Sequence, residues 1–136
     1  MPSFNIDGTI VFTYYTDLER ACAFYRDILG LRLVVDQGWC KIFQIRDRSF
    51  IGLVDSEHGT HRAHEIKPVI VSFITQDLDA WYAHLQAHGV AIRNPLGMSE
   101  RIGVRGFMAL DPEGYVLEFE SFLVQPRNAD MRALLS

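Results

Sequence analysis

The chain has 136 residues and a formal net charge of −4 at neutral pH, and 49% of its residues are hydrophobic. This length supports one domain with a real core, and the composition excludes a disordered protein. No dense basic cluster points to nucleic acid, and no apolar run is long enough to span a membrane. Two cysteines do not make a disulfide framework and no signal peptide is evident, so we expect a cytoplasmic protein.

An internal repeat organises the chain. The segment "IVFTYYTDLERACAFYRDILGLRLV" begins at Ile10, and "IVSFITQDLDAWYAHLQAHGVAI" begins at Ile70. Both read as a strand, Asp-Leu, a helix, a glycine and a strand. The range Thr16–Glu19 has the spacing of a capping box at the start of the first helix. Gly30 and Gly89 follow the two helical patterns, which predicts that each helix ends there.

Three short strands follow the glycine of each half, so each half reads βαβββ. They are "LRLVVDQG", "WCKIFQIRD" and "SFIGLVD" in the first half and "VAIRN", "GFMALD" and "YVLEFESF" in the second. We therefore predict an α+β fold. Its two βαβββ modules would form a cupped, mostly antiparallel eight-stranded surface with the helices outside and a ligand pocket in the concave interior.

The predicted boundaries describe a single domain, residues 1–136. Module one covers about 8–57 and module two about 68–123, joined by a linker at about 58–67. We expect residues 124–136 to form a loosely docked C-terminal tail.

The motifs "DLERACAFYRDILGLRL" and "LDPEGYVLEFES" resemble those of the glyoxalase/bleomycin resistance/dioxygenase superfamily, also called vicinal oxygen chelate (VOC) proteins. The resemblance covers about residues 8–123. It implies paired βαβββ modules, often in a homodimer and sometimes with modules exchanged between chains. It does not determine the reaction, because members of one fold carry out many chemistries and some carry out none.

In the metal-dependent members, the resemblance implies divalent-metal ligands on the first and last strands of each module. Here those positions hold Ile10, Gly52, Ile70 and Glu118. A hard divalent cation needs several oxygen or nitrogen ligands, and only Glu118 offers one. We therefore expect no metal cofactor. The chain is closest in character to the metal-free, bleomycin-resistance-like members, which hold a drug in their groove.

Strand alternation predicts which side chains line a ligand-binding wall, because every second residue of a strand points to the same side. Gly52 would leave room for a ligand, and Arg105 would pair with Glu118 or with an anionic ligand. For each aromatic residue, ordinary core packing is the alternative interpretation. The complete candidate set is Phe12, Tyr14, Trp39, Phe50, Gly52, Ser72, Arg105, Phe107, Glu118 and Glu120.

Glu118 is a carboxylate within an apolar strand. Partial burial would raise its pKa, and it could pair with a cationic group of a ligand. In the linker, His58, His61 and His64 recur every third residue. That spacing is compatible with a metal site, with a solvent-exposed connection, and with a connection that closes over the cavity.

Three functions follow from these observations. The first is a binding protein, a homodimer that sequesters an aromatic or amphipathic small molecule without metal, as antibiotic-sequestration proteins do. The second is a glyoxalase- or dioxygenase-like lyase, isomerase or oxygenase. It would use either a non-standard metal-ligand set that includes Glu118 or metal-free acid–base chemistry by Glu118. The third is an accessory module that responds to a ligand.

Overall fold

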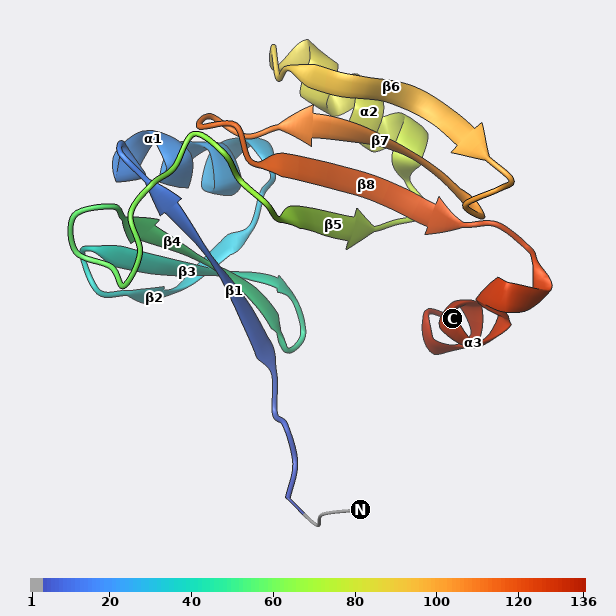
Figure 1. Ribbon diagram of the computed structural model, residues 1–136, viewed down its shortest axis with the longest axis horizontal. Helices are drawn as coiled ribbons and strands as arrows, with labels where there is room; N and C mark the ends of the chain where they lie inside the picture. The colour runs from blue at the N-terminus through green and yellow to red at the C-terminus, as the bar shows by residue number, and fades with distance from the viewer. Residues whose placement is uncertain (1–3) are drawn as a thin grey trace. The chain divides into compact units, whose positions relative to one another are not determined.

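The computed structural model describes residues 4–136, which form two compact units divided after Ile66. The first unit contains β1 (Thr9–Tyr15), α1 (Leu18–Ala23), the π-helical turn η1 (Phe24–Ile28), β2 (Arg32–Asp36), β3 (Cys40–Arg46) and β4 (Ser49–Asp55) (Figure 1). The second contains β5 (Ile70–Ile74), α2 (Leu78–Ala87), β6 (Ile92–Ser99), β7 (Val104–Leu110) and β8 (Val116–Phe122). A 3₁₀ turn η2 (Pro126–Asn128) and α3 (Ala129–Leu134) follow it. No helix of the described residues is long and apolar enough to cross a membrane.

Each unit is built on one four-stranded mixed sheet, with strand order β1-β4-β3-β2 in the first unit and β5-β8-β7-β6 in the second. The first and last strands of each unit are parallel neighbours, and the other neighbouring pairs are antiparallel. This topology confirms the predicted α+β class and the two βαβββ modules. The parallel pair places positions from the two ends of a module side by side.

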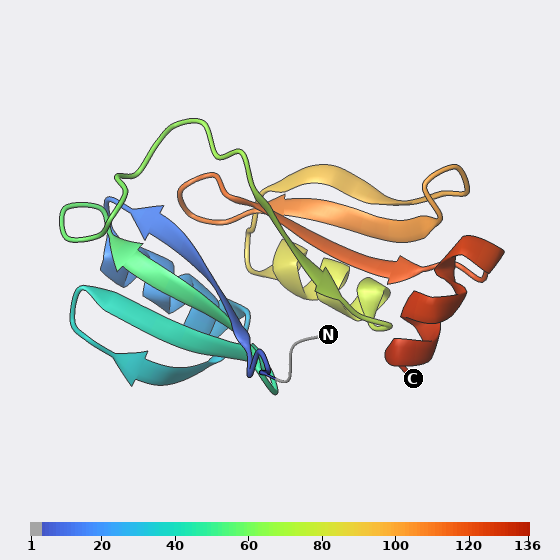
Figure 2. The ribbon, with the colours of Figure 1, turned by 60° about the horizontal axis from the view of Figure 1, so that its bottom comes forward.

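A helix covers one face of each sheet. Figure 2 shows α1 against one face of the β1–β4 sheet and α2 against one face of the β5–β8 sheet. The other face of each sheet points away from that helix. We call it the open face of that unit, and the candidate site lies there.

The C-terminal ends of the helices agree with the sequence prediction, whereas the residue that caps the start of α1 differs from it. The Asp17 carboxylate caps α1 by accepting a hydrogen bond from the backbone N–H of Arg20 at 3.1 Å. The capping residue is therefore Asp17 and not Thr16, because a carboxylate at this position reaches the free N–H of the first turn directly. Gly30 and Gly89 follow the helical segments with φ of +71° and +70°, which confirms the predicted ends.

The core of the first unit lies between its helical segment and its sheet. Alternate residues of β1, β3 and β4 meet the apolar face of that segment, as strand and helix periodicity require. The buried side chains there are Tyr15, Leu18, Ala21, Cys22, Phe24, Tyr25, Leu29, Phe43, Ile51 and Leu53.

The core of the second unit is aromatic. Phe107 and Phe119 stack with ring centroids 5.0 Å apart and an interplanar angle of 5°. From α2, Tyr82 lies 4.9 Å from Phe107 and Trp81 lies 5.2 Å from Phe119. Phe107 is only 2% exposed. It therefore belongs to the core beneath α2 and not, as predicted, to the ligand-binding wall.

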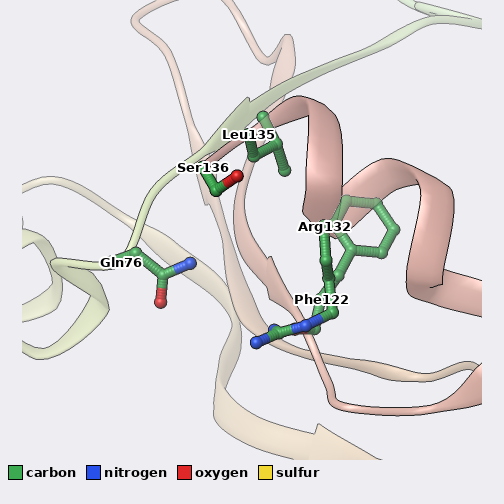
Figure 3. Close-up of a pocket in the computed structure, with 5 residues that line it drawn as sticks. All are labelled: Gln76, Phe122, Arg132, Leu135 and Ser136. Atoms are coloured by element: carbon green, nitrogen blue, oxygen red, sulfur yellow. The ribbon is translucent and has the colours of Figure 1, made fainter.

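The C-terminal segment is tied to the second unit and is not loosely docked. The buried amide of Asn128 donates to the carbonyl oxygens of Gly103 and Leu123 at 2.8 and 3.0 Å. Arg132 of α3 donates to the carbonyl oxygen of Phe122. A small cavity of about 210 Å³ lies between α3 and the sheet; its lining residues, drawn in Figure 3, are Gln76, Phe122, Arg132, Leu135 and Ser136.

Candidate functional site

Two carboxylates lie on the open face of the second unit. The parallel register pairs Ser72 of β5 with Glu118 of β8, and Ile74 with Glu120. The hydroxyl of Ser72 donates to Oε2 of Glu120 at 2.9 Å. Because Glu118 and Glu120 are two residues apart on one strand, both point away from α2. Ser72, Glu118 and Glu120 therefore share a face, as alternation predicts, and their role in binding stays a prediction.

The pair changes the acidity of Glu118. Partial burial raises the pKa of Glu118 to about 7, and its hydrogen bond with Glu120 and the negative charge of Glu120 add to the effect. The hydrogen bond with Ser72 acts in the opposite direction. Ionising both of two neighbouring, partly desolvated carboxyls costs free energy, so one of them keeps its proton to higher pH. Glu118 therefore gains or loses a proton close to neutral pH.

Beside Glu118 the open face becomes apolar and hollow. A depression of about 570 Å³ is lined by Lys67, Pro68, Val69, Ile70, Arg93, Met108 and Val116. We call it the β5–β8 hollow. Met108 is the register partner of Glu118, and Val116 is the partner of Ile70, so the hollow adjoins the carboxylate pair. An apolar surface with few polar groups at its edge is the usual composition of a small-molecule site.

None of the residues that line the hollow belongs to the predicted set of ligand-binding residues. Met108 could have been found from alternation, because β7 is antiparallel to β8 and places Met108 opposite Glu118. Strand alternation does not predict that Lys67 or Arg93 lies beside Glu118. Lys67 belongs to the segment before β5, and Arg93 lies near a point where the β6–β7 pairing shifts register.

Arg105 does not reach the carboxylate pair. Its Nη2 lies 2.8 Å from Oδ1 of Asp79, and its Nη1 lies 3.3 Å from Oδ2, which makes a two-pronged ion pair with the start of α2. The Arg105 guanidinium lowers the pKa of Asp79. The predicted pairing of Arg105 with Glu118 is therefore wrong. Residues 105 and 107 of β7 both point to the helix side of the sheet.

The open face of the first unit is filled differently. Phe12 is the register partner of Gly52. A Cβ atom added at Gly52 would lie 2.5 Å from two carbons of the Phe12 ring. The Phe12 ring thus occupies the space over Gly52 that was predicted for a ligand. Phe12 itself remains 44% exposed and presents the outer side of its ring to solvent.

Of the other predicted aromatics of the first unit, Tyr14 and Phe50 lie on this face, and Trp39 lies before β3, where its carbonyl oxygen accepts a hydrogen bond from the N–H of Asp55. Tyr14 is half-buried, and its ring lies 5.4 Å from the ring of His61 in the linker. Phe50 is half-buried and lies beside Ile10 in the register. Trp39 is 43% exposed and precedes β3 instead of beginning it. Their part in ligand binding stays a prediction.

The donor atoms at the family's metal positions do not fit a divalent ion. Ile10, Gly52 and Ile70 offer no side-chain lone pair, which leaves Glu118 as a single oxygen ligand. In the register, Ile70 lies beside Val116, and Glu118 lies beside Ser72. In residues 4–136, no three side chains of His, Cys, Asp or Glu come together in a way that could hold a metal ion.

Comparison with known families and structures agrees with the fold. Residues 10–119 match the family described as the Glyoxalase/Bleomycin resistance protein/Dioxygenase superfamily. The crystal structure of TioX from Micromonospora sp. ML1 matches with a TM-score of 0.71 and 21% identity over 85% of this chain and 98% of that chain.

Two further crystal structures are also similar. Lactoylglutathione lyase from Agrobacterium tumefaciens has a TM-score of 0.68 and 23% identity over 88% of this chain and 94% of that chain. The fosfomycin resistance protein FosX from Listeria monocytogenes has a TM-score of 0.69 and 17% identity over 91% of this chain and 97% of that chain. At such identities the similarity establishes the fold alone.

Proposed function

Because the chain belongs to the glyoxalase/bleomycin resistance/dioxygenase superfamily, we propose that it binds and sequesters an aromatic or amphipathic small molecule without a metal ion. The observation that carries this proposal is the β5–β8 hollow with the carboxylate pair at its edge. The isoleucines at the family's metal positions support metal independence, since they offer dispersion contacts and no lone pair.

The surface of the hollow suits such a ligand. Ile70 is 52% exposed, and Met108 and Val116 are half-buried beside it. Exposed apolar side chains that lie together mark interaction sites, and covering them with a ring removes them from water at about 25 cal/mol per Å². Methionine adapts its shape to different rings. Glu118 supplies a hydrogen-bond donor or acceptor, depending on its protonation.

A homodimer is the assembly that we propose. β1 and β5 are edge strands of their sheets, and both expose apolar side chains, among them Ile10 and Ile74. Edges of this kind are normally covered by another chain or element. Light scattering coupled to size-exclusion chromatography tests this part, and a monomer at micromolar concentration would contradict it.

Two measurements test metal-free binding. The first is metal analysis of protein purified without a histidine tag. Stoichiometric zinc, nickel, manganese or iron that is lost in Glu118→Gln would contradict the proposal. The second is a thermal-shift screen with cationic, neutral and anionic aromatic antibiotics. A true ligand at saturating concentration stabilises the folded state by mass action and raises Tm by several degrees. If no member of a broad panel does so, binding on this face is refuted.

The second candidate is an enzyme, and the pKa of Glu118 favours it. A general acid or base works best when its pKa lies near the working pH, and the pKa of Glu118 is raised to about 7. A metal-dependent version would need ligands in addition to Glu118. Mass spectrometry of a ligand found by the screen separates the candidates. An unchanged ligand after long incubation supports sequestration, and a product that forms with wild type but not with Glu118→Gln supports catalysis.

A further inference from the structure

Two cations flank the β5–β8 hollow. Lys67 lines it from the segment before β5, and Arg93 lines it from β6. Nζ of Lys67 lies 5.0 Å from the centroid of the Tyr115 ring. Nη1 of Arg93 donates to Oδ1 of Asn94 at 2.7 Å. Within residues 4–136, neither cation has a carboxylate oxygen within 4.0 Å, so both positive charges lack an ion-pair partner.

The rest of the lining is apolar, which gives the hollow a local charge opposite to that of the chain. The formal net charge of the protein is −4, yet both ionisable side chains of the hollow are basic. Glu118, opposite Met108, is the carboxylate next to the hollow in the register. Burial raises the pKa of Glu118 to about 7, and the negative charge of Glu120, two residues further along β8, adds to the effect, so Glu118 offsets the two cations only in part.

We propose that the hollow takes an amphipathic anion. Its apolar or aromatic body lies on Ile70, Met108 and Val116, and its carboxylate, sulfonate or phosphate group is held by Lys67 and Arg93. A guanidinium binds such groups through two parallel hydrogen bonds. The Tyr115 ring favours the ammonium of Lys67 near its face. This inference rests on the proposed function and names the chemical class of its ligand.

A pair of probes that differ by one charged group tests the inference. 1-Anilinonaphthalene-8-sulfonate is the anionic probe, and N-phenyl-1-naphthylamine has the same rings without the sulfonate. Fluorescence titrations compare wild type with the double variant Lys67→Gln/Arg93→Gln. The matched control is Arg101→Gln, which removes an exposed cation from the β6–β7 turn. That turn lies at the far end of β6 from Arg93, about 20 Å away at strand rise.

Wild type should bind the sulfonate more tightly than the neutral probe. The double variant should lose about tenfold in affinity for the sulfonate, which is the effect of two partly screened ion contacts. Its affinity for the neutral probe should stay within about twofold, and Arg101→Gln should match wild type. Added salt should weaken sulfonate binding in wild type and much less in the double variant. Ile70→Ser should weaken both probes, because it removes part of the apolar surface.

The possible failures are distinguishable. If the neutral probe binds and the double variant keeps wild-type affinity for the sulfonate, the anion inference is overturned and the proposed function stands. If Ile70→Ser changes neither probe, binding lies outside the hollow and the inference is again overturned. If neither probe nor any panel ligand binds, the proposed function itself fails. Circular dichroism and binding of the neutral probe report whether the double variant is folded, and the single variant Arg93→Gln, at an exposed side chain, replaces it if needed.

Discussion

Replacing Glu118 by Gln should stabilise the protein above neutral pH and leave its stability almost unchanged in mild acid. Glutamine keeps the shape of a protonated glutamate and can still donate a hydrogen bond to Glu120. The pKa of Glu118 is raised from 4.5 to about 7 in the folded protein. The folded state therefore holds this proton more tightly than the unfolded chain does. The carboxyl favours folding least above pH 7, where it is ionised in both states.

The size of the effect follows from the same pKa change. A move from 4.5 to about 7 corresponds to roughly 3 kcal/mol of differential interaction between the two protonation states. The Glu118 carboxyl is only partly buried, and solvent screens part of this energy. We therefore expect Glu118→Gln to gain about 1–2 kcal/mol of unfolding free energy at pH 8. The gain should shrink as pH falls from 7 towards 4.5.

Urea denaturation at several pH values between 4.5 and 8 measures the difference between variant and wild type. Histidines and the other carboxyls titrate in both proteins, so their contributions largely cancel in the difference. Glu100→Gln removes an exposed carboxylate from the same unit and serves as the control for losing one negative charge. A constant difference across the pH range, or a loss of stability in Glu118→Gln at pH 8, would refute the reasoning.

Three further substitutions in the second unit, two of them compared with a second variant, probe its packing. Phe107→Ala should lower the free energy of unfolding by about 3–5 kcal/mol, because it removes a stacked core side chain, whereas Phe12→Ala, on an open face, should lower it much less. Equal losses in urea denaturation would contradict the assignment of Phe107 to the core and of Phe12 to the open face. Gly106→Ala should lower Tm because its added methyl group would meet the backbone of β8 at 2.4 Å, whereas Gly97→Ala meets nothing closer than 3.9 Å and should behave as wild type. Asn128→Ala should speed cleavage of the C-terminal segment in limited proteolysis, because its amide ties η2 to two carbonyl oxygens; an unchanged rate would mean that other contacts hold the segment.

The modules could be predicted from sequence because their signals are local and occur twice. Asp17-Leu18 and Asp77-Leu78 start the helices, and Gly30 and Gly89 end them, so each pattern supports the other. Strand alternation then places Ser72 with the carboxylates of β8. These inferences need only the periods of strands and helices, which are fixed by backbone geometry.

The errors in the site have a common physical origin in β7. Its sequence "VRGFMAL" carries apolar residues on both faces, so period-two alternation is weak and does not say which face meets the helix. The sequence pattern therefore assigns Phe107 and Arg105 to the open face, where the structure has Met108 instead. The ion pair between Arg105 and Asp79 joins residues 26 apart. Surface ion pairs contribute little free energy, so sequence patterns specify them weakly.

The two repeats differ at an equivalent pair of neighbouring positions on their open faces. Phe12 beside Gly52 in the first unit corresponds to Ser72 beside Glu118 in the second, because Ile10 and Ile70 stand two residues earlier in the same register. In the first unit this pair is an aromatic ring over a glycine, and in the second unit it is a hydroxyl beside a carboxyl. A carboxylate introduced by Gly52→Glu would not restore a matching pair, since its Cβ would lie 2.5 Å from the Phe12 ring. The open face of the first unit thus presents an aromatic ring for stacking, and the open face of the second presents a carboxyl whose pKa lies near neutral pH.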